Sequence, residues 1–229
     1  MLGERGETVS QGDIVSQRGE SVAEKESTRV EAFSDGVFAF AITLLVLSLV
    51  VPELGSNDSV ATALHKVSEE GPSYLSVVVT FATIYVLWMS HHALFRRVHH
   101  LDGRTTLVNG LVLLLIASSP FPTAMLAKYF LEPVGRFAAA FYAFYFLLVN
   151  LSFLLLSMAI YRNEQAGIEG HSDLQVRRFR RRIMMSPIAY LAAIVAGLWM
   201  AWATVVICGA MAVFWVWVSF QRQNHQHQA

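Results

Sequence analysis

The sequence predicts an all-α integral membrane protein with six transmembrane helices. Hydrophobic residues make up 55% of the 229-residue chain and charged residues only 15%, with a mean hydropathy of +0.47. A soluble domain of this length carries about a quarter charged residues. The apolar residues gather in blocks, most of them close to the ~20 residues that a helix needs to cross a bilayer. Composition and block length together place most of the chain in lipid.

The expected spans follow these apolar blocks in chain order. The first four blocks each provide one span. The fifth block, 183–220, is too long for one span, so we divide it into two short helices with a tight turn near residues 199–203. The expected spans are about 33–51, 74–95, 107–127, 137–161, 183–200 and 203–220. In the third of these, the prolines of SSPFPT, Pro120 and Pro122, should kink or end the helix.

The segments outside the spans are polar and set the expected orientation. Residues 1–28 mix both signs of charge and lack the apolar core of a signal peptide, so we expect a disordered cytoplasmic tail. Residues 29–221 form the expected membrane domain, and 222–229 a second cytoplasmic tail. All but three of the 17 Lys and Arg residues fall on one side of the six spans. Positive charge stays in the cytoplasm, which places both termini there.

Charge and cysteine content narrow the functional classes. The net charge is zero, so nothing indicates a nucleic-acid partner. The single cysteine, Cys208, lies inside an apolar block, which excludes a disulfide framework and a cysteine-rich metal site. Four histidines, His91, His92, His99 and His100, fall on several helix faces with no carboxylate or cysteine at ligand spacing. We expect no resident metal, no cofactor and no enzyme activity.

The first span combines an apolar stripe with polar residues on the other side of the helix. At about 100° per residue, Phe40, Leu44 and Leu47 lie within about 60° of one another. Such stripes usually pack in a core or touch lipid, and less often line a path. Ser34 and Asp35 point about 120–140° away. The Asp35 carboxylate therefore does not face the stripe and would be buried against neighbouring helices.

A buried carboxylate at this position needs hydrogen-bond donors. Trp88 and His91, near the cytoplasmic end of the second span, and Asn109, near the start of the third, could supply them. In the alternative interpretation, Trp88 is an interfacial anchor and His91 a hydrated helix-end residue. Arg29 and Asp35 would then only mark the cytoplasmic end of a helix, although an ionisable residue there is a candidate functional site.

The stretch RVEAFSDGVFAFAITLLVL resembles the RxxxFSD signature of the transmembrane protein 175 family of potassium channels. The match continues into WMSHHALFRRVHHLD and VNGLVLLLIASSPFPTAML, so it covers roughly residues 29–127. The resemblance implies a cell-membrane homotetramer of six-helix subunits, whose partners are its own copies and the lipid bilayer. The first helix of each subunit would line a central pore.

The resemblance also implies roles for individual residues. Phe40, Leu44 and Leu47 match the bulky apolar side chains that constrict the family's pore, and Thr43 matches a polar position beside them. Phe40 departs from the isoleucine or leucine that is usual at the narrowest position. The signature and the residues that hold it would form a structural network between helices rather than an ion site. The network consists of Arg29, Phe33, Ser34, Asp35, Trp88, His91 and, from its position alone, Asn109.

The expected function is therefore a potassium-preferring cation leak channel with a hydrophobic constriction. An apolar ring blocks ions when it is narrow and dry. When it is wider, it favours potassium over sodium, because potassium sheds its water more easily. The alternative is a proton-coupled secondary transporter in which Asp35 and His91 titrate as a pair.

Overall fold

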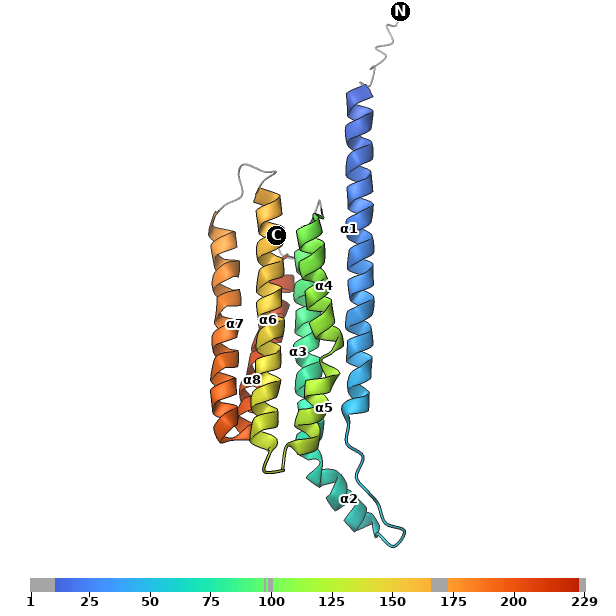
Figure 1. Ribbon diagram of the computed structural model, residues 1–229, viewed down its shortest axis with the longest axis vertical. Helices are drawn as coiled ribbons and strands as arrows, with labels where there is room; N and C mark the ends of the chain where they lie inside the picture. Colours follow the sequence, from blue (N-terminus) through green and yellow to red (C-terminus); the bar gives the residue numbers. More distant parts are fainter. Residues whose placement is uncertain (1–10, 97, 99–100, 166–172, 227–229) are drawn as a thin grey trace, which may run out of the picture.

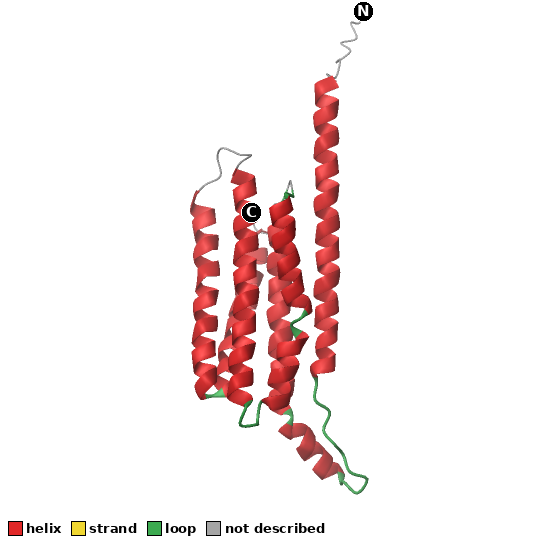
Figure 2. Ribbon diagram, viewed as in Figure 1, coloured by secondary structure: helices red, strands yellow, loops and turns green. Residues whose placement is uncertain are grey.

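The protein forms a bundle of long, roughly parallel and antiparallel helices (Figures 1 and 2). The computed structural model describes residues 11–96, 98, 101–165 and 173–226, with the side chains of 25–96, 98, 101–162 and 186–217. Every described element is helical. The elements are α1 (Gln11–Leu44), the 3₁₀ helix η1 (Leu45–Ser48), α2 (Val60–Glu69), α3 (Gly71–Phe95), α4 (Gly103–Ala117), α5 (Pro120–Tyr129), α6 (Gly135–Gln165), α7 (Asp173–Trp199) and α8 (Ala201–Gln226).

Four stretches are long and apolar enough to cross a membrane, which confirms an all-helical, multi-pass membrane architecture. They are Lys25–Ser48, Gly71–Phe95, Gly103–Tyr129 and Gly135–Arg162. The last apolar block forms two shorter helices, Ser186–Trp199 and Ala201–Trp217, joined at Met200 where the turn was expected. The count of six spans stays a prediction, because the described side chains cover only part of α7 (Asp173–Trp199) and α8 (Ala201–Gln226).

The first helix differs from the prediction at both ends. The expected disordered tail is wrong for residues 11–28, since α1 begins at Gln11 and runs unbroken into the first span. Extending an existing helix costs much less than nucleating a new one, and residues 11–28 contain no proline. At the other end, α1 tightens into η1 at Leu45, and the backbone is extended at Leu49. Pro52 follows shortly and disfavours helix at Val51.

The third span is broken where the sequence predicts. α4 ends at Ala117 and α5 begins at Pro120, whose missing N–H is tolerated at a first helical position. The Ser48 hydroxyl of η1 donates to the Pro120 carbonyl at 3.2 Å, so the end of the first span is tied to the break. On the next turn, the Thr123 hydroxyl donates to Thr80 Oγ1 at 3.1 Å, which links α5 to α3.

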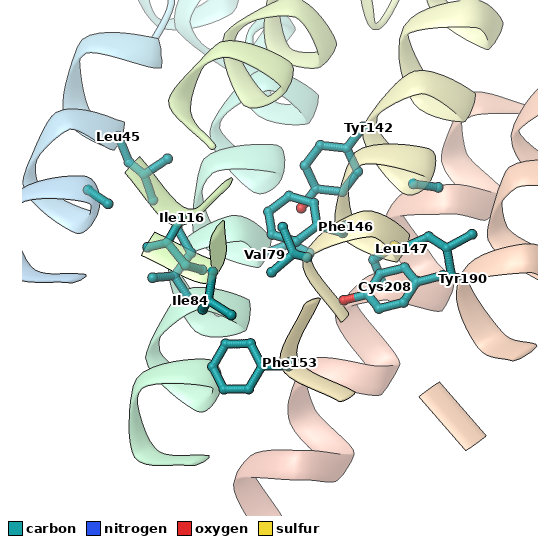
Figure 3. Close-up of a cluster of buried hydrophobic side chains, with 14 of the residues drawn as sticks. Leu45, Val79, Ile84, Ile116, Tyr142, Phe146, Leu147, Phe153, Tyr190 and Cys208 are labelled. Carbon is teal, nitrogen blue, oxygen red and sulfur yellow. The ribbon is translucent and has the colours of Figure 1, made fainter. Parts of the chain in front are cut away.

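The position of α1 at the edge of the bundle matters most for function (Figure 1). α1 packs against α3 and α4, and η1 packs against α5 and α3. Phe38, Ala41 and Leu45, spaced three and four residues apart, are buried on this inner side. They join a core that runs through the bundle and includes Ile84 and Tyr142 (Figure 3). The opposite side of α1 is left uncovered by the residues that the structure describes.

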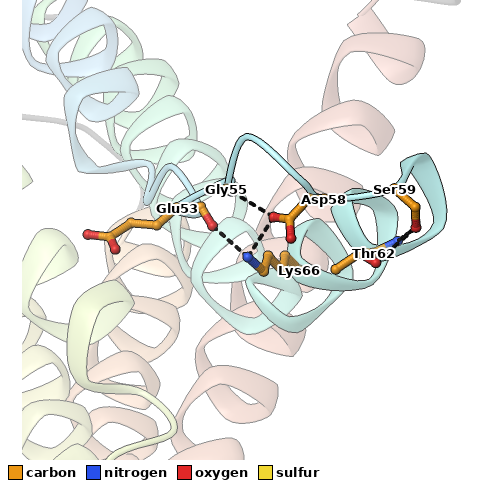
Figure 4. A network of polar contacts seen from close by, with 6 residues as sticks. All are labelled: Glu53, Gly55, Asp58, Ser59, Thr62 and Lys66. Atoms are coloured by element: carbon orange, nitrogen blue, oxygen red, sulfur yellow. Dashed lines mark hydrogen bonds and ion pairs between the residues drawn. The ribbon is translucent and has the colours of Figure 1, made fainter.

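An additional helix, α2, interrupts the connection between the first and second spans, and the sequence analysis did not predict it. The Ser59 hydroxyl caps α2 by accepting the Thr62 N–H at 3.2 Å. The Lys66 ammonium donates to Asp58 Oδ2 at 2.7 Å and to the Glu53 carbonyl at 3.0 Å (Figure 4). The hydrogen bond from Lys66 holds the pKa of the Asp58 carboxyl below its usual value. These contacts fold the preceding loop onto α2.

Asp102 provides a test of how α4 begins, because its Oδ1 accepts the Thr105 N–H at 2.9 Å and caps the helix. We expect Asp102→Ala to lower the free energy of unfolding by about 1 kcal/mol, and Asp102→Asn to retain most of it. The measurement is thermal unfolding of the purified protein in detergent at pH 7. Equal stability of all three proteins would contradict the capping role.

The same cap predicts a pH dependence. Hydrogen bonding from Thr105 lowers the pKa of the Asp102 carboxyl below its usual value of 3.8. Stability from this group is therefore fully present above about pH 4 and is lost as the pH falls through the lower, folded-state pKa. Unfolding curves from pH 7 down to pH 3 should show this loss of stability in the parent protein and not in Asp102→Asn.

Candidate functional site on the first transmembrane helix

The uncovered side of α1 carries a continuous row of five residues that we call the α1 seam: Phe33, Gly36, Phe40, Thr43 and Leu47. Large apolar side chains dominate it, with exposed fractions of 66% for Phe33, 61% for Phe40 and 80% for Leu47. Gly36 and Thr43 between them are also exposed. The spacing alternates between three and four residues, which aligns all five on one side of a helix. The seam has no partner within the described part of the chain.

The predicted constriction residues fall on or beside this seam. Phe40, Thr43 and Leu47 belong to it, whereas Leu44 is half-buried next to it. The Thr43 hydroxyl donates its hydrogen to the Phe40 carbonyl at 2.8 Å. Since the hydrogen points along the helix, the lone pairs of Thr43 Oγ1 stay free on the exposed side. The seam therefore presents one oxygen acceptor among phenyl rings and a leucine.

Behind the seam, a buried hydrogen-bonded chain joins α1, α4 and α3. The Ser34 hydroxyl donates to the Val30 carbonyl at 2.8 Å and accepts from Asn109 Nδ2 at 3.1 Å. Asn109 Oδ1 lies 2.9 Å from His91 Nε2, so this imidazole nitrogen carries the hydrogen and donates it. Ser34, Asn109 and His91 are all buried. In a buried site each of these bonds is costly to lose, because the group left behind has no water to bind.

A second set of contacts joins α1 directly to α3 at the same level. The Trp88 indole N–H donates to Asp35 Oδ1 at 2.8 Å. One turn away, His92 Nδ1 lies 2.8 Å from Glu31 Oε1. The predicted network of Asp35 with Trp88, His91 and Asn109 is thus divided: Asp35 accepts from Trp88, whereas Asn109 bonds to Ser34 and His91 bonds to Asn109.

Glu31 is the network residue that sequence reasoning missed. Glu31 precedes Asp35 by four residues, and His92 follows Trp88 by four. On two antiparallel helices, pairs four residues apart meet in reversed order, so an Asp35–Trp88 contact brings Glu31 to His92. This repeated spacing of four residues is the signal that could have identified the second pair.

Arg29 does not join the network as predicted. Its side chain is exposed, and no hydrogen bond or ion pair connects it to Asp35 among the described residues. The physical reason is angular, since six residues along a helix rotate the side chain by about 120° from its start. Arg29 instead lies within about 20–40° of Phe33 and Gly36 around the helix axis. Arg29 therefore lies on the same side of α1 as the α1 seam, one turn before Phe33.

The histidines of the second span are engaged in these contacts. The His91 ring stacks on Phe95, with the ring centroids 4.3 Å apart, and it also meets Phe38 of α1 at 5.3 Å. His92 pairs with Glu31. Within the described residues no three metal-ligating side chains gather. His99 and His100, the other two considered for metal binding, lie outside the described residues.

Asn109 offers the sharpest test of the buried chain, because it bonds to both Ser34 and His91. We expect Asn109→Ala to lower the free energy of unfolding by about 1–3 kcal/mol, since two buried polar groups lose their partners. Denaturation in detergent measures this. The matched control is Gly110→Ala, where an added Cβ meets no atom within 4 Å. It should be neutral or stabilising; equal loss in both variants would refute the role of the chain.

The amino-acid sequence is similar to those of known potassium channels. Residues 29–120 match the family described as endosomal/lysosomal potassium channel TMEM175. The chain is 35% identical over 195 residues to a potassium channel of Chamaesiphon minutus, covering 85% of this chain and 96% of that protein. It is 43% identical over 129 residues to a potassium channel of Streptomyces collinus, covering 56% and 61% of the two chains. These relatives are ion channels and not enzymes.

The fold and a more distant relative agree with this assignment. The crystal structure of a lysosomal potassium-selective channel TMEM175 homolog from Chamaesiphon minutus is similar with a TM-score of 0.75 at 34% identity. It covers 85% of this chain and 98% of that one. In Gallus gallus, a protein named endosomal/lysosomal proton channel TMEM175 is 36% identical over 106 residues, which is 44% of this chain and 21% of that protein. The chain belongs to the TMEM175 family of multi-pass membrane channels.

Proposed function

We propose that four copies of the chain assemble around a central axis and conduct potassium across the cell membrane. The α1 seam of each copy faces this axis. The observation that carries the proposal is the exposure of Phe40 and Leu47 on a stretch of helix whose other side buries Phe38, Ala41 and Leu45. Membership of a family that includes potassium channels supplies the activity.

The proposed topology has six spans, with both termini in the cytoplasm. α7 and α8 supply the fifth and sixth spans in this scheme. α7 (Asp173–Trp199) and α8 (Ala201–Gln226) are 27 and 26 residues long, which is enough to cross the hydrocarbon core of a bilayer. With this topology, only Lys66, Lys128 and Arg136 among the Lys and Arg residues face outward, in agreement with the positive-inside rule.

In the proposed mechanism, the constriction consists of Phe40, Leu44 and Leu47 from each copy. None of these side chains coordinates an ion, so the pore conducts only while it is wide enough for a partly hydrated one. The larger potassium ion holds its water less strongly than sodium, because ion–water attraction falls with distance, and it passes more readily. The free lone pairs of Thr43 Oγ1 would replace part of the lost water beside the constriction.

Phe40 gives this chain a second source of cation preference. A phenyl ring presents a negative face, and a cation over that face gains about 0.5–2 kcal/mol. The exposed Phe40 ring packs against no other aromatic ring in the described structure. Rotation of its side chain would either turn the ring edge into the pore and narrow it, or turn the face toward a passing cation.

A proton-coupled transporter using Asp35 and His91 is the second candidate. The Gallus gallus relative is named a proton channel, which favours a role for protons in the family. In this structure, however, Asp35 binds Trp88 and His91 binds Asn109, so no direct hydrogen bond passes a proton between them. Neither residue belongs to the α1 seam. These contacts support a structural role for both residues.

Bilayer recording from the reconstituted protein under opposed potassium and sodium gradients tests the proposal. A reversal potential displaced toward potassium, with currents too large for a carrier cycle, would support a potassium channel. Gradient-driven uptake of a solute without such currents would instead favour the transporter. A current that reverses at the proton equilibrium potential would replace potassium with protons as the permeant ion.

Replacing Phe40 tests the constriction. We expect Phe40→Ala to increase the single-channel current or to reduce potassium-over-sodium selectivity, because it widens the narrowest ring and removes the phenyl face. The control is Phe137→Ala on α6, since Phe137 is as exposed as Phe40, at 61%. Unchanged currents and selectivity in Phe40→Ala, or equal changes in both variants, would contradict the proposed constriction.

A further inference from the structure

α2 carries an apolar face that the single chain does not cover. Val60, Leu64 and Val67, which we call the α2 stripe, are 79%, 65% and 41% exposed. Their spacing of four and three residues places them on one side of the helix. The preceding segment adds two more exposed apolar side chains, Val51 at 83% and Leu54 at 57%. Exposed apolar side chains are therefore found both after the end of the first span and on α2.

The physics of short helices indicates that this face is covered in the functional protein. α2 has only ten residues, and none of them is buried. A helix of this length is marginal in water, and in proteins it is stabilised mainly by packing its apolar face. The Ser59 cap and the Lys66–Asp58 ion pair position the helix, but they do not replace that packing. Among the described helices, α2 makes a limited contact with α3.

The chemistry of α2 argues against the lipid surface as the cover. Helices that lie in a membrane interface are typically rich in Lys and Arg and place Trp or Phe in the apolar face. α2, with the sequence VATALHKVSE, has no aromatic residue and a single Lys66, already paired with Asp58. Figure 1 shows α2 inclined to the spans, with its far end projecting beyond them.

The position of α2 points to a second copy of the chain. From the base of α3, α2 leans toward the side of the bundle where α1 stands, past the end of the first span (Figure 1). Exposed apolar side chains recur at Leu47 of the α1 seam, at Val51 and Leu54, and on the α2 stripe after the polar residues 55–59. If the seam faces an axis shared by several copies, the same symmetry brings their α2 helices together beyond its end.

We infer that the α2 stripes of neighbouring copies pack against one another and form a collar at the outer mouth of the assembly. This inference rests on the proposed assembly with α1 at its centre. The collar buries Val60, Leu64 and Val67 between copies and leaves the polar side of α2, with Lys66 and Glu69, toward water. It also rigidifies the link between the first and second spans.

Disulfide crosslinking tests the collar. The background is Cys208→Ser, which removes the single cysteine. Leu64→Cys places a thiol on the stripe, and Val67→Cys repeats the test at a second stripe position. The control, Glu69→Cys, lies about 140° from Leu64 around the helix. Under mild copper–phenanthroline oxidation in liposomes, we expect the stripe variants to form linked dimers at least five-fold faster than the control, because a disulfide needs closely facing Cβ atoms.

The number of subunits, measured by native mass spectrometry on the same proteins, separates the possible failures. Four subunits with no preference for the stripe positions would overturn the collar and leave the proposed channel standing. A monomer would overturn both. A fluorophore attached at position 64 detects the lipid alternative: strong quenching by brominated lipids would show that membrane covers the stripe, and would also overturn the collar.

Discussion

The rest of the structure depends on the hydrogen bonds that fix the rotation of α1. In lipid, apolar packing discriminates poorly between helix faces, because the surrounding acyl chains are as apolar as leucine. Ser34 and Asp35 remove this ambiguity, since both must meet donors on α3 and α4. Once these two side chains point inward, Phe38 and Ala41 follow them into the core. The seam is what remains on the other side.

The opposite end of α1 is attached by a different device. There the third span is broken at Ser118–Ser119, and the break leaves backbone groups that need partners. Ser48 takes the Pro120 carbonyl, and Thr123 connects the next turn to Thr80, which also bonds to Tyr142 of α6 at 2.9 Å. The proline break thus gives the end of the first span a polar anchor. α1 is held at both ends, and its packing between them is purely apolar.

Sequence reasoning reached those features that a single helix determines. Helical angles alone placed Asp35 opposite the Phe40 stripe, and proline chemistry located the break in the third span. The contacts that sequence reasoning missed depend on how two helices pack against each other. Predicting the Glu31–His92 pair requires the relative register of α1 and α3. Predicting that Asn109 binds Ser34 rather than Asp35 requires the depth at which α1 and α4 meet. The α2 helix was missed because residues 60–69 form no apolar block long enough for a span. Arg29 precedes Asp35 by six residues, which separates the two side chains by about 120° around the helix and keeps them from sharing one set of partners.

The α1 seam and the polar groups that hold α1 in place lie on different sides of the helix. Seam residues from Phe33 to Leu47 carry no ionisable group, whereas Glu31, Asp35 and His91 all point toward α3 or α4. A buried carboxylate that faced a narrow apolar pore would bind cations tightly and slow their release. With Asp35 bound to Trp88 behind the helix, its charge supports the fold without forming such a trap. In the proposed channel, rapid leak through an apolar ring therefore requires that the signature carboxylate face away from the axis.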